Sequence, residues 1–285
     1  MRYFIFLALI AGFPCVASAS ITAGDLVGGQ LNALEDDDFE MLVNAGGTVL
    51  APGANTVLDV GDYLAGVIRF TAVEAPFGSG TQTANATSTQ PTITALFLTR
   101  ITSVTGDNDN DGQIDTNFTF GAPTVAEWAA VFAGTGAPIA TTDGSIAVVF
   151  QDPTNIDPSI PTWYLTADGT ELWEWGMRGD ANEFWQAAAD SADISTAFDV
   201  VTDSGLFSAA LNVTEQGAGP KLGPTFGPGS AEVLLVGGSL APSFNPILPV
   251  RSDVDILIRP IPEPATALTW IGLVSAAAAM RGRRR

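Results

Sequence analysis

The fold class is decided by GVIRFTAV at residues 66–73 and TALFLTRI at residues 94–101. Both are apolar runs of strand length, rich in β-branched or aromatic residues. Similar runs recur at residues 145–150, 231–236 and 254–258, with Gly, Pro and Asp turns between them. This pattern is typical of β-sandwiches and barrels. We expect a mainly β domain with a β-sandwich or jelly-roll-like fold.

Two segments of the same domain have the pattern of a short helix. Thr124-Val125-Ala126-Glu127 has the form of a capping box and precedes the apolar residues 128–132. In a capping box, the side chains of the first and fourth residues accept hydrogen bonds from each other's backbone N–H groups. Asp180-Ala181-Asn182-Glu183 has the same form and precedes residues 184–189. We therefore expect one or two short helices.

The N-terminus has the three parts of a secretory signal peptide, residues 1–19. Arg2 supplies a positive start, and residues 3–13 form an apolar segment of suitable length. Ala17-Ser18-Ala19 matches the small-x-small pattern that signal peptidase cleaves, which places the cut between Ala19 and Ser20. An uncleaved anchor is the alternative. Residues 20–260 are then an exported β-rich domain.

The C-terminus carries a second ordered set of signals, residues 261–285. Pro262-Glu263-Pro264 precedes an apolar run at 265–280 and an arginine-rich end. The prolines favour an extended segment that a processing enzyme can grip. As a transmembrane helix the run is about 24 Å long against a bilayer core of about 30 Å, so it spans only if the arginines reach the interface. The arginines place the tail on the cytoplasmic side.

This order of parts resembles the PEP-CTERM sorting signal of Gram-negative bacteria. The resemblance implies recognition by an exosortase, a membrane-embedded enzyme similar to cysteine proteases, which would cut near Pro262-Glu263-Pro264. The precursor would be held in the inner membrane transiently through residues 265–280, and the product would end at the cell surface or outside the cell. Such proteins are commonly associated with exopolysaccharide and biofilm, so exopolysaccharide is an implied partner. A plain anchor with a proline-rich stalk is the alternative.

The composition excludes several classes of function. All 31 acidic residues lie between Asp25 and Glu263 with only six basic ones, a net charge of −25 for this part. Such a surface repels nucleic acid and anionic lipid, so we expect no nucleic-acid partner. The chain has no histidine, and its one cysteine, Cys15, lies in the leader. A conventional catalytic triad and a His/Cys zinc site are therefore excluded, and we expect that the protein is not an enzyme.

An acidic loop with the spacing of a calcium site lies within the domain. In Asp107-Asn108-Asp109-Asn110-Asp111-Gly112-Gln113-Ile114-Asp115, carboxylates fall at positions 1, 3 and 5, and Gly112 permits a sharp turn. Ile114 is expected to pack the loop against the fold. These nine residues resemble the DxDxDG loops of EF-hand, dockerin and thrombospondin-type repeats, but Phe118 replaces the bidentate Glu of an EF-hand. We expect a structural Ca²⁺ in a β-hairpin loop, bound by Asp107, Asp109, Asp111, the Gln113 carbonyl and Asp115. An acidic turn without an ion is the alternative.

Two further clusters have a plain and a functional interpretation. The acidic run at residues 35–40 predicts a solvated loop, with a second cation site as the alternative. In the Trp/Glu-rich segment 163–185, Trp173 and Trp175 share one face of a strand, with Glu171 on the same side. If the two indoles are exposed, they suit sugar binding; if buried, they are core.

Two functions remain open from the sequence. One is a non-enzymatic envelope or extracellular-matrix protein. The other is a carbohydrate-binding module or glycosidase that uses the segment 163–185, since a glycosidase needs only two carboxylates.

Overall fold

The computed structural model describes residues 20–50, 57–85, 92–106, 114–132, 141–153, 169–189, 192, 205–242 and 250–262. In this part the chain is mainly β, as the sequence predicts, with one α-helix. The strands are β1 (Asn32–Val43), β2 (Val49–Leu50), β3 (Tyr63–Glu74), β4 (Gln82–Asn85), β5 (Thr92–Thr105), β6 (Thr116–Gly121), β7 (Ser145–Asp152), β8 (Thr170–Gly176), β9 (Phe184–Ala189), β10 (Gly205–Gln216), β11 (Leu222–Gly223), β12 (Val233–Pro242) and β13 (Val250–Pro260). The helices are the 3₁₀ helix η1 (Ala23–Asp25) and α1 (Val125–Val131).

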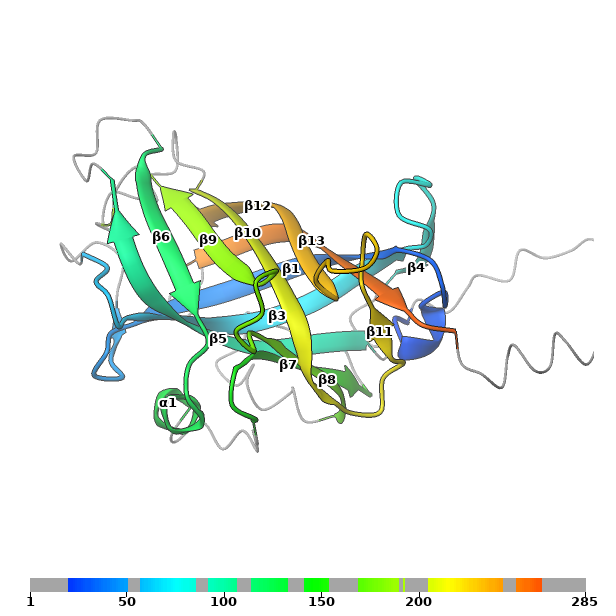
Figure 1. Cartoon of the computed structure of the whole chain (residues 1–285), viewed down its shortest axis with the longest axis horizontal. Coiled ribbons are helices and arrows are strands. Elements are labelled where there is room, and N and C mark those ends of the chain that lie inside the picture. Colours follow the sequence, from blue (N-terminus) through cyan, green and yellow to red (C-terminus); the bar gives the residue numbers. More distant parts are fainter. Residues whose placement is uncertain are drawn as a thin grey trace, which may run out of the picture.

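The strands close into an eight-position antiparallel barrel (Figure 1). On one side β1 pairs with β3, and β3 with β5. On the other side β10 pairs with β12, β12 with β13, and β13 with β1, which closes the ring. Between β5 and β10 the wall is completed by β7 with β8 and by β6 with β9. Because wall strands that follow one another in sequence lie side by side, the topology is up-and-down.

Two of the eight wall positions are interrupted strands. The first half of β5 pairs with β7 and the second half with β6, so β6 and β7 lie in one line with α1 between them. In the same way, the two halves of β10 pair with β9 and β8, with residues 177–183 between them. Near the break, a Cβ on Gly176 would overlap the Gly144 carbonyl oxygen, so only glycine allows this close approach.

The mainly β class is confirmed. The expected β-sandwich or jelly-roll-like fold is wrong, because the sheet closes into a barrel. Sandwiches and barrels share short strands and turn residues, so the local pattern does not separate them. The pairing of β1 with β13 decides the matter, since it brings Asn32 opposite Ile258. No local pattern reports a contact between residues so far apart.

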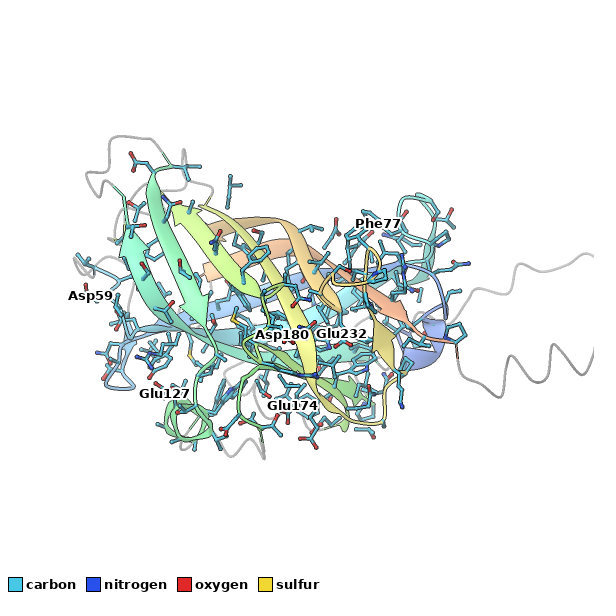
Figure 2. The ribbon with its side chains drawn as sticks, in the orientation of Figure 1. Asp59, Phe77, Glu127, Glu174, Asp180 and Glu232 are labelled. Atoms are coloured by element: carbon cyan, nitrogen blue, oxygen red, sulfur yellow. The ribbon has the colours of Figure 1, made fainter. Side chains whose placement is uncertain are left out.

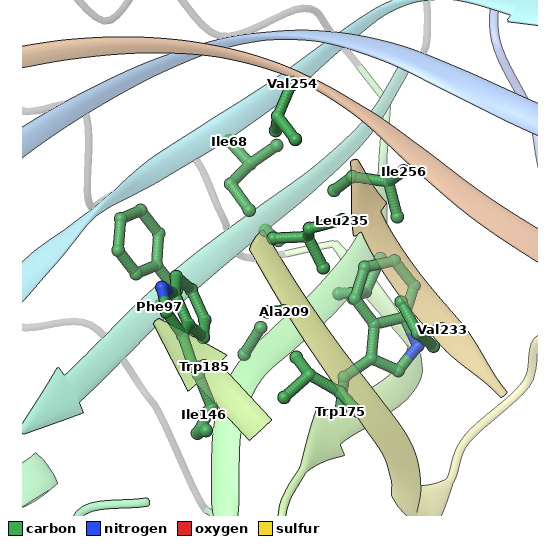
Figure 3. Close-up of a cluster of buried hydrophobic side chains, with 14 of the residues drawn as sticks. Ile68, Phe97, Ile146, Trp175, Trp185, Ala209, Val233, Leu235, Val254 and Ile256 are labelled. Carbon is green, nitrogen blue, oxygen red and sulfur yellow. The ribbon is translucent and has the colours of Figure 1, made fainter. Parts of the chain in front are cut away.

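The barrel interior is filled by large apolar side chains (Figure 3). Trp175, Trp185 and Phe97 lie there among aliphatic side chains from β3, β12 and β13. Trp173 stacks on Trp175 with 5.9 Å between ring centroids, and its Nε1 donates to the Pro220 carbonyl oxygen at 2.8 Å. An eight-stranded barrel is just wide enough for side chains to fill. Burial of each large ring contributes about 2–3 kcal/mol.

A second apolar cluster lies outside the wall, beneath α1. Outward-facing side chains of β1, β3, β5 and β7 pack against Trp128 and Phe132, whose rings stack at 5.3 Å. Trp128 Nε1 also donates to the Ser145 carbonyl oxygen at 3.0 Å. The predicted capping box is confirmed: Thr124 Oγ1 accepts from the Glu127 N–H at 3.2 Å, and Glu127 Oε2 from the Thr124 N–H at 2.6 Å.

Glu127 also attaches α1 to the barrel wall. The Tyr63 hydroxyl donates to Glu127 Oε1 at 2.8 Å, and Arg100 Nη1 lies 3.3 Å from the same oxygen. Burial, then the hydrogen bond to Glu127, raises the pKa of Tyr63 to about 12. Burial alone would raise the pKa of Glu127, but the hydrogen bonds from Thr124 and Tyr63 and the charge of Arg100 hold it below its ordinary value.

The second expected helix is wrong, because residues 184–189 form β9. Glu183 does cap the turn before it: its Oε2 accepts hydrogen bonds from the Gly179 and Asp180 N–H groups at 2.8 and 2.9 Å. The chain then pairs with β10 and β6, and its side chains alternate between solvent and interior. Burial of Trp185 and the two ladders outweigh the helix preference of the alanines, which is below about 1 kcal/mol per residue.

The two ends of the barrel carry different parts of the chain. The terminal end, where β1 begins and β13 ends, carries residues 20–31, 75–81, 217–232 and 260–262. At the far end β1, β5, β9 and β12 end and β3, β6, β10 and β13 begin. Figure 2 shows Asp59 at the far end and Phe77 at the terminal end. Both chain ends of the described domain therefore leave from one side.

Candidate functional site

The predicted calcium loop connects β5 to β6 at the far end. It is a hairpin loop between antiparallel strands, as expected. The neck of this hairpin is tight, because Gly106 has a φ of 110° and a Cβ there would overlap the Asp115 carbonyl oxygen. Asn117 Nδ2 donates to the same oxygen at 2.9 Å. Gly106 and Asp115, at the two ends of the loop, are thus held close together.

The calcium ion itself stays a prediction of the sequence. Asp107, Asp109, Asp111 and Gln113 lie outside the described residues, whereas Asp115 is half-buried just before β6. Ile114 is 43% exposed, so the expectation that it packs against the fold is wrong. It precedes Thr116, the first paired residue of β6. Within the described ranges, no group of three or more His, Cys, Asp or Glu side chains could hold a metal ion.

The acidic run at residues 35–40 belongs to a strand, so the expected solvated loop is wrong. It lies in β1, where Asp36 is 7% and Glu40 2% exposed. Asp36 Oδ1 accepts a hydrogen bond from the Val254 N–H at 3.0 Å. At this point the β1–β13 ladder lacks a regular pair, so the carboxylate takes the place of a backbone acceptor. Barrel closure buries Asp36 and Glu40 despite their charge.

A small cavity in the far half of the barrel is lined by Glu40 and four aromatic rings. Trp185 lies at the centre of the aromatic group, with ring centroids 6.1 Å from Phe97, 6.2 Å from Phe120 and 6.5 Å from Phe207. The cavity measures about 20 Å³, room for about one water molecule. Pockets for organic ligands measure about 300–1,000 Å³. In this packing the cavity does not accommodate a sugar.

The candidate sugar-binding residues Trp173 and Trp175 are core residues. Their side chains are 0% and 1% exposed, and both belong to the interior cluster. A sugar needs a free ring face to stack on, so the structure contradicts the use of these two rings as a binding platform. Trp163, at the start of the same segment, lies outside the described residues.

Glu171 does not line a surface shared with the two tryptophans. Phe150 pairs with Glu171 and Val149 with Trp173, so β8 has one extra residue between these pairs. A bulge of this kind changes the face on which the following side chains point. Burial, then the charges of Glu174 and Glu215, raises the pKa of Glu171 above its ordinary value.

Glu174 is a buried structural carboxylate, 2% exposed. Its Oε2 accepts hydrogen bonds from the Thr142 N–H at 2.9 Å, from Thr142 Oγ1 at 2.7 Å and from Ser145 Oγ. Ser145 Oγ also lies 2.9 Å from Thr214 Oγ1. These contacts hold the start of β7 against β8 and β10.

The predicted sorting and cleavage residues lie at the edges of the described chain. Ala19, Glu263 and Pro264 lie outside it, whereas Ser20 and Pro262 lie inside. Pro262 is exposed yet close to the N-terminal segment, since a Cβ on Gly28 would lie 3.3 Å from the Pro262 Cα.

The described ranges contain no helix that is both long and apolar enough to cross a membrane. The predicted sorting helix at residues 265–280 lies outside those ranges.

Sequence reasoning missed the cavity and its carboxylate. The available signal was the period-2 spacing of Asp36, Glu40 and Leu42, which places all three on one face of a strand. The convergence of Phe97, Phe120, Trp185 and Phe207 had no local signal, because these rings come from four different strands.

Comparison with known proteins finds no relative: no family model, curated protein or solved structure matches the chain.

Proposed function

We propose that this chain is a non-enzymatic, exported envelope or extracellular-matrix protein of a Gram-negative bacterium, processed by signal peptidase and an exosortase. The observation that carries the proposal is the position of the sorting signals relative to the fold. The strands of the barrel wall lie between Asn32 and Pro260 in the sequence. The first residue of the sorting motif, Pro262, is exposed two positions later. Neither signal is part of the closed wall, so both can be removed without opening the barrel.

The geometry at this exit suits a processing enzyme. The Ile261 N–H donates to the Lys221 carbonyl oxygen at 2.7 Å, the last backbone hydrogen bond before the motif. Ile261 is 47% exposed. The motif thus follows directly after a rigid anchor, and proline geometry favours an extended chain there. An extended, exposed segment is the form that proteolytic enzymes bind.

A structural or adhesive role is favoured over sugar chemistry at the segment 163–185. The burial of Trp173 and Trp175 removes the stacking surface that the alternative required. The chain has no histidine, and its one cysteine lies in the leader. Exopolysaccharide stays a proposed partner through the resemblance of residues 261–285 alone.

Mass spectrometry of the protein purified from its host tests the processing. Trypsin cuts poorly before proline, so an unprocessed chain yields a peptide covering residues 252–281, with Arg259-Pro260 intact. A processed chain instead yields a shorter peptide that begins at residue 252 and ends near Pro262-Glu263-Pro264. Glu263→Ala serves as the matched control and restores the long peptide. Recovery of the long peptide from the mature native protein would refute exosortase processing.

Binding of residues 20–260 to the host's exopolysaccharide tests the partner. The measurement is run in calcium and again with a chelator. Saturable binding is expected, and calcium dependence would assign a role to the loop at Asp107–Asp115. Absence of binding in both buffers removes the polysaccharide partner and leaves the processing proposal intact.

A further inference from the structure

We infer that the terminal end of the barrel rests on the membrane headgroup layer while the precursor is anchored, so that the far end, with the predicted calcium loop, points away from the cell. This inference rests on the proposed function, because it requires residues 265–280 to span the inner membrane. It adds a contact surface and an orientation that the sorting signal alone does not specify.

The first support is the length of chain between barrel and predicted helix. Pro262 is the last described residue, and the apolar run starts at Ala265. Three residue steps span at most about 11 Å. The headgroup layer on each side of a bilayer is about 5–8 Å thick. The predicted helix is also about 6 Å shorter than the bilayer core, which draws its ends inward. The connecting chain is therefore too short to hold the barrel away from the headgroups.

The second support is the set of apolar side chains on this end. Val27, Phe77, Ile261 and Phe226 are 37%, 42%, 47% and 64% exposed. They come from four separate segments, which backbone hydrogen bonds tie together in part: Phe77 N–H donates to the Leu31 carbonyl oxygen at 2.8 Å, and Ile261 N–H to that of Lys221 at 2.7 Å. The free energy of exposed apolar side chains falls when they enter the membrane–water interface.

Exposed apolar side chains alone do not show which end of the barrel contacts the membrane. The far end also exposes Val49, Val57 and Val60. The choice comes from the tether, because β13 ends at the terminal end and its chain leaves there. A strand about 12 residues long separates the ends by roughly 30 Å once its tilt is included, so residues at the far end cannot reach the headgroups.

The charges at the terminal end are compatible with a zwitterionic surface. The Asp25 carboxylate points back to the turn that it belongs to, where its Oδ2 accepts a hydrogen bond from the Thr22 N–H at 2.7 Å. Glu74 Oε1 likewise accepts from the Gly80 N–H in the β3–β4 connection. Lys221 is exposed on this end and can meet a phosphate. Since the domain's net charge disfavours anionic lipid, the predicted partner is a phosphatidylethanolamine or phosphatidylcholine headgroup layer.

Single-cysteine labelling of the precursor without its leader, residues 20–285, tests the inference directly. Cys15 leaves with the leader, so the mature chain has no other thiol. Phe77→Cys and Phe226→Cys place a label on the terminal end, and Val60→Cys, with similar exposure to Phe226, is the matched control on the far end. Each variant is inserted into phosphatidylcholine vesicles and labelled with an environment-sensitive fluorophore. Nitroxide-bearing headgroup lipids serve as the quencher, and far-UV circular dichroism checks each fold.

We expect blue-shifted emission and strong quenching at residues 77 and 226, and neither effect at residue 60. If the chain floats with the vesicles but all three labels behave alike, the inference is refuted and the anchor stands. If the chain does not float with the vesicles, the anchoring helix of the proposed function is refuted, and the inference falls with it.

Discussion

One part of the barrel wall is buried on both faces, whereas another is buried on the inner face only. In β3, Leu64 and Ile68 face the interior, while Ala65 and Val67 face the cluster beneath α1. In β6, which this cluster does not include, Phe118 and Phe120 are buried, whereas Asn117 and Thr119 are exposed. The same wall therefore produces two sequence patterns, and the difference is made by α1.

This difference explains the continuous apolar runs at residues 66–73 and 94–101. A strand buried on both faces reads as a continuous apolar run, while one with a solvent face alternates. The continuous runs therefore indicated a covering layer outside the sheet. In a sandwich the second sheet covers only the inner face of the first, whereas here a short helix also covers part of the outer face.

The largest effect is expected from the inner layer. Trp175→Ala should lower the free energy of unfolding by about 4 kcal/mol, because a fully buried ring leaves a cavity in a closed wall. Chemical denaturation of residues 20–260 measures this. Phe226→Ala, at an exposed ring, is the control, with an expected loss below about 0.5 kcal/mol. Equal losses would show that the interior is not the main source of stability.

The outer layer should cost less to disrupt. Trp128→Ala is expected to lose about 2 kcal/mol, less than an interior tryptophan, because α1 can relax towards the wall. Below its melting temperature, the variant should have the same far-UV circular dichroism spectrum as the parent. If Trp128→Ala loses as much free energy of unfolding as Trp175→Ala, the two layers form one cooperative core and the distinction between them is wrong.

Calcium should act on neither layer. With a dissociation constant of about 10⁻³ M, 10 mM Ca²⁺ should add about 1.4 kcal/mol to the free energy of unfolding. The gain should be the same in Trp128→Ala and in the parent, since distant sites add. Asp107→Asn combined with Asp109→Asn should abolish it. An unchanged melting temperature in a chelator-stripped parent would remove the calcium site.

The smallest effect tests how Tyr63 attaches α1. The fold raises the pKa of Tyr63 from 10.0 to about 12. The folded state then keeps a proton that the unfolded state loses, so stability is full below pH 10 and falls as the pH rises to about 12. The loss should be about 1 kcal/mol after solvent screening. Tyr63→Phe should show a smaller loss between pH 10 and 12, measured by urea denaturation; an identical pH profile would contradict the assignment.

The sequence predicted the features that depend on neighbours in the chain. The strand runs and the Thr124 capping box are confirmed, because a hydrogen bond between residues three apart needs no distant partner. The same local form at Asp180 gave a turn followed by β9, since β6 and β10 supplied ladders that no local pattern shows. The sequence left open whether Trp173 and Trp175 are core or a sugar platform, and their burial in the interior cluster decides for core.

The sequence by itself determined the mainly β class, the first helix and the hairpin position of the acidic loop, because each follows from local spacing and turn residues. It also predicts export and sorting signals at the two ends, which lie almost entirely outside the described residues. Only the tertiary structure decided that the wall closes through β1 and β13, that Asp36 and Glu40 are buried, and that both termini leave from one end. These features depend on contacts between residues far apart in the chain, whose free energy is gained only when the whole ring forms.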